Sequence, residues 1–118
     1  MYDRNNVFAK IIRGEIPAKI IYESEHALSF YDISPKAPIH VLVIPKGFYE
    51  NFLDFSRSAQ DVEILDFHQA VQETAKLVKI DEKGFRIISN CGVNGGQEIP
   101  HYHVHLLGGS PIGPMIFN

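Results

Sequence analysis

The sequence predicts an α+β fold, in which an antiparallel β-sheet is combined with one long and one short α-helix. Two observations lead to this prediction. Residues 58–79 repeat apolar side chains at intervals of three and four, as an amphipathic helix does. Several short segments rich in β-branched and aromatic residues are separated by turn-forming residues, which is typical of strands joined by hairpins.

The first predicted element is a short helix over residues 7–13. Phe8, Ile11 and Ile12 fall at helical spacing within it. Gly14 follows as a residue suited to the helix C-terminus. We therefore expect one short helix before the first strand.

A hairpin and a third strand should follow this helix. Residues 19–23 and 27–31 are rich in β-branched and aromatic side chains and are separated by three polar residues. Residues 32–38 contain two prolines and turn-forming residues, which predicts a loop. This loop leads into a strand over residues 40–44 and lies where a ligand could enter.

The long helix should cover the sheet, and two more strands should complete the fold. Its apolar stripe consists of Ile64, Phe67, Val71, Ala75 and Val78. A strand over residues 85–89, a glycine-rich turn over 90–97 and a last strand over about 101–107 are predicted after it.

Composition narrows the class of protein. The 118 residues are 45% hydrophobic and 21% charged, which suits a single globular domain spanning residues 1–118. The net charge of −3 and the scattered lysines and arginines argue against nucleic-acid binding. The apolar runs are too short to span a membrane, and no export signal begins the chain, so we expect a cytoplasmic protein. The single cysteine agrees with a reducing compartment.

Three histidines alternate with bulky apolar residues in the last predicted strand. They are His101, His103 and His105, within the sequence His-Tyr-His-Val-His-Leu-Leu. Successive side chains of a strand point to opposite faces, so all three imidazoles should lie on one face and their apolar neighbours should face the core.

The residues alone leave three interpretations of this motif open. The first is a polar face with a purely structural role. The second is a zinc site completed by a further ligand such as His40 or Glu98, because histidines two apart on a strand can reach one metal. The third is a nucleophile, since an imidazole with a pKa of about 6.5 is largely neutral at pH 7.

Phosphorus is the electrophile that best suits such a nucleophile. A neutral imidazole can split one difficult displacement into two easier ones through a phosphohistidine. His103 would be the attacking residue, flanked by the other two histidines. Asn90 and the backbone amides of residues 95–97 are neutral donors that could contact phosphate oxygens.

The motif also resembles the signature of the histidine triad (HIT) family, in which three histidines alternate with apolar residues. Further segments are similar to the Hint-type purine nucleoside phosphoramidase branch of that family, including its bacterial members. These segments are residues 8–17, 31–38, 40–46, 95–98 and 106–115. The last of them is more similar to this branch than to the diadenosine polyphosphate hydrolases or the sugar-phosphate uridylyltransferases.

The resemblance implies an activity and a partner. Members of this branch hydrolyse the phosphorus–nitrogen bond of purine nucleoside monophosphate amides through a nucleotidyl-histidine, without a metal or other cofactor. This chain would then be a homodimer whose two sheets join into one, acting on AMP or GMP amides. A hydrolase of dinucleoside polyphosphates or other nucleotidyl conjugates, and a non-enzymatic nucleotide-binding dimer, remain alternatives.

The resemblance also implies roles for individual residues. His103 would be the nucleophile, His101 its neighbour, His40 the histidine that orients it, and His105 and Asn90 phosphate contacts. Asp32 would accept hydrogen bonds from the ribose hydroxyls. The apolar slot for the base comprises Phe8, Ile11, Ile16, Phe30 and Ile33, and further nucleotide contacts are Gly96, Gln97 and Glu98. The proton for the departing amine would come from Glu98 or a histidine.

Overall fold

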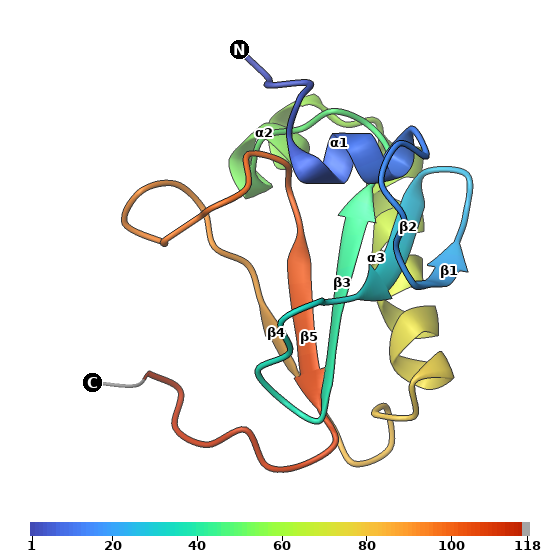
Figure 1. Ribbon diagram of the computed structural model, residues 1–118, viewed down its shortest axis with the longest axis vertical. Helices are drawn as coiled ribbons and strands as arrows, with labels where there is room; N and C mark the ends of the chain where they lie inside the picture. Colours follow the sequence, from blue (N-terminus) through green and yellow to red (C-terminus); the bar gives the residue numbers. More distant parts are fainter. Residues whose placement is uncertain (117–118) are drawn as a thin grey trace.

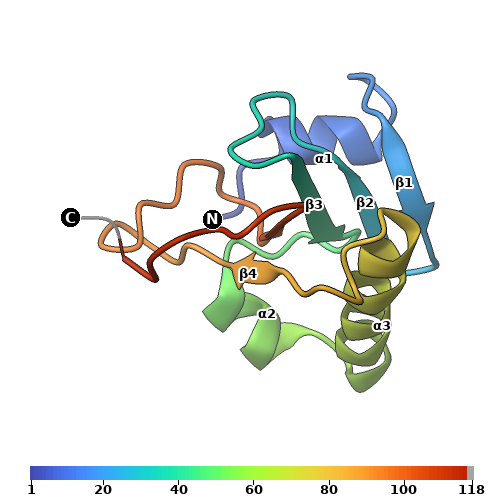
Figure 2. The same cartoon turned by 90° about the horizontal axis from the view of Figure 1, so that it is seen from below.

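The computed structural model describes residues 1–116 and contains a five-stranded antiparallel sheet in the order β1-β2-β3-β5-β4 (Figure 1). The strands are β1 Ile20–Glu23, β2 Ala27–Tyr31, β3 Ile39–Pro45, β4 Arg86–Ile88 and β5 Val104–Gly108. The predicted hairpin is formed by β1 and β2. Helix α1 covers one face of the sheet, while α2 and α3 lie on the other (Figure 2). The predicted α+β fold is confirmed.

Helix α1, Val7–Ile12, begins and ends close to where the sequence predicts. The side chain of Asn6 caps its N-terminus by accepting a hydrogen bond from the backbone N–H of Ala9 at 2.9 Å. Gly14 has a φ of 77°, a left-handed conformation that a glycine adopts without strain.

The predicted helix over residues 58–79 is α3, Asp61–Leu77, and a further helix that the sequence analysis missed precedes it. This helix is α2, Phe52–Ser58, of which only Phe55 is buried. A segment with one buried side chain has no apolar stripe for periodicity to reveal. Extended backbone separates the two helices, and the backbone N–H of Gln60 donates to Glu63 Oε1 at 3.0 Å at the start of α3.

Helix α3 packs through a stripe that differs in part from the predicted one. Phe67 and Ala75 are buried as predicted, and Val71 and Val78 are half-buried. Ile64 is exposed, so its assignment to the stripe was wrong. Ala70 and Thr74 complete the buried surface of the helix.

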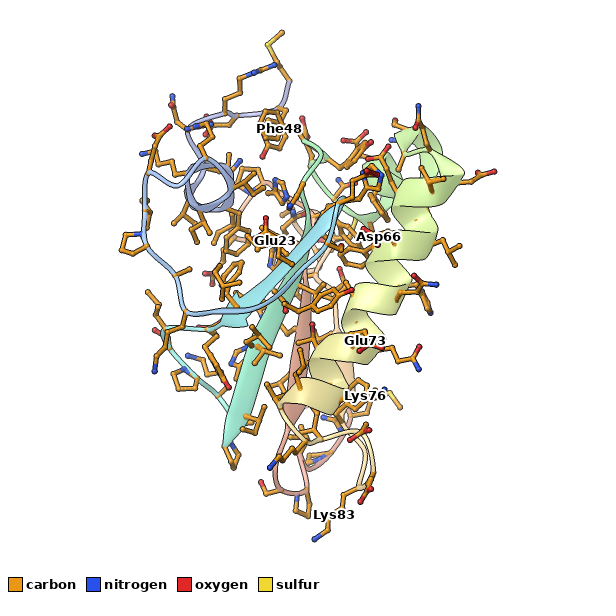
Figure 3. All side chains as sticks on the ribbon, turned by 90° about the vertical axis from the view of Figure 1, so that its right-hand side faces the viewer. Glu23, Phe48, Asp66, Glu73, Lys76 and Lys83 are labelled. Carbon is orange, nitrogen blue, oxygen red and sulfur yellow. The ribbon has the colours of Figure 1, made fainter. Side chains whose placement is uncertain are left out.

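Polar contacts fix α3 against the β1–β2 hairpin. Asp66 Oδ2 accepts hydrogen bonds from Ser24 Oγ at 2.7 Å and from the backbone N–H of His26 at 2.9 Å. Figure 3 shows Asp66 on the same helix as the solvent-facing Glu73 and Lys76. Further along, Thr74 Oγ1 donates to Ser29 Oγ of β2 at 2.7 Å, and neither side chain has any exposed surface.

Strand β5 is shorter at its start than the predicted strand over residues 101–107. Its first pairing with β3 joins Val104 to Val43, and β3 ends at Pro45. Proline has no N–H to donate, so the ladder stops there. The backbone N–H of Tyr102 donates to Tyr49 O at 2.7 Å instead. The predicted strand over residues 85–89 is β4, which is one residue shorter at each end.

The alternation of the histidine motif nevertheless continues through this segment. Tyr102, Val104 and Leu106 are buried in the core on the α3 face. The rings of His101 and His103 lie 6.2 and 5.0 Å from that of Phe8, which belongs to α1. The three imidazoles therefore share the α1 face, as predicted from the period of two.

The longest helix of residues 1–116 is α3, and neither it nor any other helix there combines the length and apolar character that crossing a bilayer requires.

Candidate functional site

A cavity of about 590 Å³ opens on the α1 face of the sheet. Its walls come from α1, the segment after it, the β2–β3 loop, the loop between β4 and β5, and the inward side chains of β3 and β5. Most of the predicted site residues line it: Phe8, Ile11, Ile16, Phe30, Asp32, Ile33, His40, Asn90, Gly96, Glu98, His103 and His105. The fold thus brings together side chains that are distant in sequence.

Two predicted site residues lie outside the cavity wall. His101 is fully buried and is not among the residues that line the cavity. Gln97 directs its side-chain amide away, donating to Glu50 O at 2.7 Å and to Ile99 O at 3.0 Å. Its role in the structure is to hold the loop between β4 and β5 against the rest of the chain.

The predicted phosphate contacts from backbone amides in this loop are partly wrong. The N–H of Gly96 donates to Val93 O at 3.0 Å, and the N–H of Gln97 donates to Gly92 O at 3.1 Å. These donors close turns within the loop itself and are not free for a ligand. Gly96 still lines the cavity, with a φ of 74°.

Other cavity residues were missed by the sequence analysis. They include Val7, Ala18, Lys36, Leu42, Ile99 and Leu107. The period of two on β3 and β5 does place Leu42 beside His40, and Leu107 beside His105, on one face. No sequence pattern marks Lys36, whose contribution is a backbone contact described below.

His103 has a hydrogen bond that fixes which of its nitrogens carries the proton. Its Nδ1 lies 2.7 Å from the carbonyl oxygen of His101. A carbonyl oxygen can only accept, so Nδ1 carries the proton and Nε2 keeps its lone pair. His103 is 7% exposed and lines the cavity, so this lone pair belongs to a side chain that a ligand can reach.

His40 and His105 are fixed in the opposite sense. The backbone N–H of Lys36 donates to His40 Nδ1 at 3.0 Å, which leaves the proton of His40 on Nε2. His40 Nε2 lies 2.9 Å from His105 Nδ1, so His40 donates and His105 accepts. The ring proton of His105 is then on Nε2. Neighbouring His103 and His105, with ring centroids 5.1 Å apart, therefore offer a lone pair and a donor respectively.

Asp32 occupies the end of the β2–β3 loop beside these rings. Its Oδ1 accepts the backbone N–H of Ser34 at 2.7 Å, which makes it a turn-capping residue. Its Oδ2 lies 3.4 Å from His40 Nε2. The carboxylate thus closes one end of the cavity, with the second oxygen turned to the histidines.

Burial favours the neutral form of His40 and of the three histidines of the motif. Burial is the main cause that lowers the pKa of His40 and of His103 below 6.5. It lowers the pKa of His101 to about 4, and the pKa of His105 also to about 4 with a smaller effect from the neighbouring histidines. At pH 7 the lone pair of His103 is therefore available.

Asp32, His40 and His105 form the group within residues 1–116 whose atoms lie close enough to hold a metal ion, all within 4.8 Å. The hydrogen bond from Lys36 opposes coordination by His40. A metal on Nε2 needs the ring proton on Nδ1, where it would face the N–H of Lys36 at 3.0 Å. The cluster is therefore better suited to hydrogen bonding than to zinc.

The arrangement combines a neutral nucleophile, hydrogen-bond donors and an apolar enclosure. Such a cavity can stabilise charge that develops on a ligand, because donors in a site with little water act more strongly than in solution. Its apolar wall, which includes Phe8, Phe30 and aliphatic side chains, can also pack against a flat ring.

The chain is similar to known proteins over most of its length. Residues 13–112 match the HIT domain. An uncharacterised HIT-like protein of Azospirillum brasilense is 54% identical over 98% of this chain and 94% of its own length. The purine nucleoside phosphoramidase of Escherichia coli K12 is 41% identical over 93% of this chain and 92% of its own length.

A solved structure of a HIT family protein has the same fold. The HIT family hydrolase from Clostridium thermocellum superposes with a TM-score of 0.84 and 42% identity, covering 98% of this chain and 99% of the other. A match over most of the chain, together with relatives above 40% identity, establishes the relationship. The chain belongs to the HIT family.

Proposed function

We propose that this protein hydrolyses the phosphorus–nitrogen bond of purine nucleoside phosphoramidates, with His103 as the nucleophile. One observation carries the proposal: hydrogen bonds give His103 and His105 opposite tautomers in one cavity. A lone pair for phosphorus and an N–H for its oxygens thus stand side by side. The name of the Escherichia coli relative supports the same substrate class.

In the first step, the Nε2 lone pair of His103 attacks the α-phosphorus and the bond from phosphorus to the amine nitrogen breaks. The amine leaves with the electron pair of that bond and takes up a proton. In the second step, water attacks phosphorus and gives up a proton to the solvent, the bond to Nε2 breaks with its electron pair returning to nitrogen, and the nucleoside monophosphate is released. His103 returns to its neutral form with its proton still on Nδ1, where it donates to the carbonyl oxygen of His101.

The cavity walls suggest how the rest of the nucleotide binds. The apolar slot takes the base against Phe8 and Phe30, whose rings pack edge to face with centroids 5.7 Å apart. Asp32 accepts hydrogen bonds from the ribose hydroxyls through Oδ2, while Oδ1 remains on Ser34. His105 and Asn90 contact the phosphate oxygens.

Glu98 is our candidate for the group that protonates the amine. It is exposed and lines the cavity on the side of the loop between β4 and β5. An exposed carboxyl can exchange protons with water between turnovers. A histidine remains the alternative proton donor. If Glu98 is the donor, a Glu98→Gln variant should lose activity, and the loss should be largest for substrates with strongly basic amines.

We also propose that two copies associate through β4. This strand is at an edge of the sheet and spans only Arg86–Ile88, and the side chain of Ile87 is 54% exposed. Pairing with a second copy would satisfy the open backbone groups and join two sheets into one. Sedimentation equilibrium tests this, and a monomer at micromolar concentration would contradict it.

Mass spectrometry of protein quenched during turnover of an adenosine phosphoramidate tests the mechanism. We expect one adenylyl group on His103 and none in a His103→Ala variant. His68→Ala, which changes an exposed histidine of α3, is the matched control and should carry the adduct as the wild type does. Equal turnover by the wild type and His103→Ala would exclude His103 as the nucleophile.

The same assay distinguishes the alternative functions. Faster cleavage of diadenosine tetraphosphate than of the phosphoramidate would assign the chain to polyphosphate hydrolysis. Tight binding of AMP without turnover of either compound would indicate a nucleotide-binding protein that does not catalyse hydrolysis.

A further inference from the structure

The first six residues precede α1 and lie outside the segment matched to the HIT domain, residues 13–112. We call Met1–Asn6 the N-terminal strap. The ring of Tyr2 stacks on that of Phe48, with centroids 4.8 Å apart and planes within 7°. The guanidinium of Arg4 lies 5.2 Å from the centroid of the same ring. Phe48 thus anchors the strap beside the loop that follows β3 (Figure 3).

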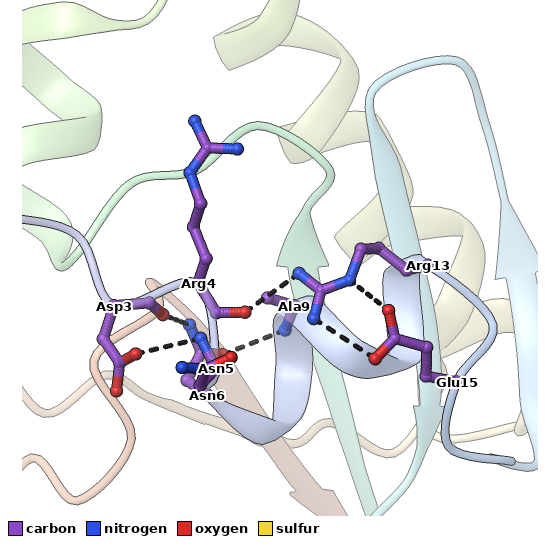
Figure 4. A network of polar contacts seen from close by, with 7 residues as sticks. All are labelled: Asp3, Arg4, Asn5, Asn6, Ala9, Arg13 and Glu15. Carbon is purple, nitrogen blue, oxygen red and sulfur yellow. Dashed lines mark hydrogen bonds and ion pairs between the residues drawn. The ribbon is translucent and has the colours of Figure 1, made fainter.

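Hydrogen bonds fix the strap to α1. Asn6, which caps α1, donates through Nδ2 to Asp3 O at 2.7 Å. Arg13, at the other end of the helix, donates to Arg4 O at 2.9 Å. Figure 4 shows these contacts together, with the ion pair between Arg13 and Glu15. The backbone of the strap is therefore held at both ends of α1.

The hydroxyl of Tyr2 reaches the ring of His101. Tyr2 Oη lies 2.5 Å from His101 Nδ1 and accepts a hydrogen bond from Asn6 Nδ2 at 2.8 Å. His101 Nε2 lies 2.9 Å from Pro45 O, so that nitrogen carries the ring proton. Nδ1 then has the lone pair, and Tyr2 must be the donor. The direction of this chain is set throughout, from Asn6 to Tyr2 to His101.

His101 connects this chain to the nucleophile through its backbone. Its carbonyl oxygen accepts the Nδ1–H of His103 at 2.7 Å, which is the contact that leaves the lone pair on Nε2. His101 is itself fully buried, and its ring has Tyr2 as its side-chain hydrogen-bond partner. The position of the accepting carbonyl therefore depends on how firmly the ring behind it is held.

We propose that Tyr2 is a positioning residue for catalysis: its hydroxyl holds His101 so that the carbonyl of His101 keeps the proton of His103 on Nδ1. This inference rests on the proposed role of His103. Without the hydroxyl, the lone pair of His101 Nδ1 would be buried and unpaired, a state that costs free energy. The His101 ring would move towards a new partner, and the bond to His103 would lengthen.

A Tyr2→Phe variant tests the proposal because phenylalanine keeps the stacking on Phe48 and loses only the hydroxyl. Tyr49→Phe is the matched control, since Tyr49 is also half-buried and donates to a different side chain, Glu63 Oε2, at 2.7 Å. On an adenosine phosphoramidate we expect Tyr2→Phe to lower kcat about tenfold with KM within about twofold. Tyr49→Phe should leave both constants unchanged.

Nitrogen-15 NMR of the histidine rings provides a readout that general destabilisation would not move. In Tyr2→Phe, the resonance of His101 Nδ1 should shift towards that of an unbonded nitrogen, and the Nδ1–H of His103 should exchange faster with water. Both signals should match the wild type in Tyr49→Phe. A lower kcat with unchanged histidine signals, or unchanged kcat in an active enzyme, would overturn the proposal.

The NMR comparison also separates this proposal from the proposed function. If the wild type does not cleave the phosphoramidate, the function fails, while the signals of His101 and His103 in the free protein still decide whether Tyr2 positions them. If Tyr2→Phe does not fold, the wild type decides. Its His101 Nδ1 should have the nitrogen-15 shift of a hydrogen-bonded lone pair, and the shift of an unbonded nitrogen would refute the proposal.

Discussion

The two faces of the sheet are built from the same strands and differ in how completely they are filled. On the α3 face, the side chains of β3 and β5 pack with those of α2 and α3 into a continuous apolar core. On the α1 face, a smaller cluster of Phe8, Leu28, Phe30, Leu42 and Ile44 leaves a cavity of about 590 Å³ beside the histidines. The closed face provides most of the apolar burial, and the open face provides the chemistry.

The comparison teaches that one strand can serve both purposes because its residues alternate. Along residues 102–107 the side chains alternate between the two faces. Tyr102, Val104 and Leu106 belong to the core, whereas His103, His105 and Leu107 line the cavity. Packing on the α3 face therefore fixes the backbone from which the imidazoles project on the α1 face. Substitutions should separate the two faces by their effect on stability and on activity.

The largest expected effect is on the closed face. Phe67 is 5% exposed and lies against the rings of Phe55 and Tyr102, so Phe67→Ala should lower the free energy of unfolding by about 3–5 kcal/mol. The kcat of the folded fraction at low temperature should stay within about twofold of the wild type. Urea unfolding and kinetics on the same sample measure both. Val93→Ala, at an exposed position, should change neither, and a large loss of kcat in folded Phe67→Ala would contradict the separation.

Acid should destabilise the protein because the histidines on the open face are buried in their neutral form. His101 has a pKa lowered to about 4, against about 6.5 in an unfolded chain, so between these values the unfolded state binds a proton that the native state does not. The contribution of neutral His101 to the free energy of unfolding is fully present above about pH 6.5 and is lost as the pH falls towards 4. The free energy of unfolding should fall by up to about 1.4 kcal/mol per pH unit for His101 near the middle of this range. Urea titrations from pH 7 to pH 4 measure this slope; a flat profile would show that His101 is not buried in a neutral form.

Asp32 should affect binding on the open face more than the chemical step. In Asp32→Asn the bond from Ser34 is retained but the negative charge is lost, so hydrogen bonds from ribose weaken. We expect KM for an adenosine phosphoramidate to rise about tenfold with kcat nearly unchanged. The 2′,3′-dideoxy substrate is the control, because its KM should be similar for both proteins. An equal rise in KM for both substrates would remove Asp32 from ribose recognition.

The smallest effect is expected at the end of α3, away from both the cavity and the closed core. Lys79 has a φ of 62°, and the N–H of Ile80 donates to Ala75 O at 3.0 Å in a helix-ending turn that usually contains glycine. Lys79→Gly should raise the free energy of unfolding by about 0.5–1 kcal/mol, as measured by urea unfolding. Lys79→Ala, which has the same strain, should bring no such gain. Activity should be the same in all three proteins.

Much of the fold was predictable because short-range pattern determines it. The period of two around His103 places the imidazoles and the core residues on the correct faces, and the spacing of Phe67 and Ala75 identifies α3. Helix α2 was missed because a segment that buries only Phe55 has no periodicity. The late start of the last strand depends on the missing N–H of Pro45, which matters only once the strands are paired.

The composition of the site was predictable in large part, but its protonation was not. The tautomer of His103 depends on a carbonyl two residues away, and that of His40 on the backbone of Lys36. Tyr2 lies 99 residues from His101 in sequence, and nothing in the pattern around it indicates a contact. Such contacts appear only when the chain has folded, because they depend on distances in space.

The backbone around the buried hydroxyl pair of Ser29 and Thr74 should be the last part of the chain to unfold. Ser29 pairs with Val43 across the sheet, and Val43 pairs with Val104, so one row leads from α3 to the residue next to His103. Hydrogen-bonded backbone beneath a packed helix is released only in global unfolding. Amide hydrogen exchange along this row should therefore be the slowest in the molecule, whereas exchange within residues 1–6 should report brief local openings during which His103 loses its alignment but the sheet stays intact.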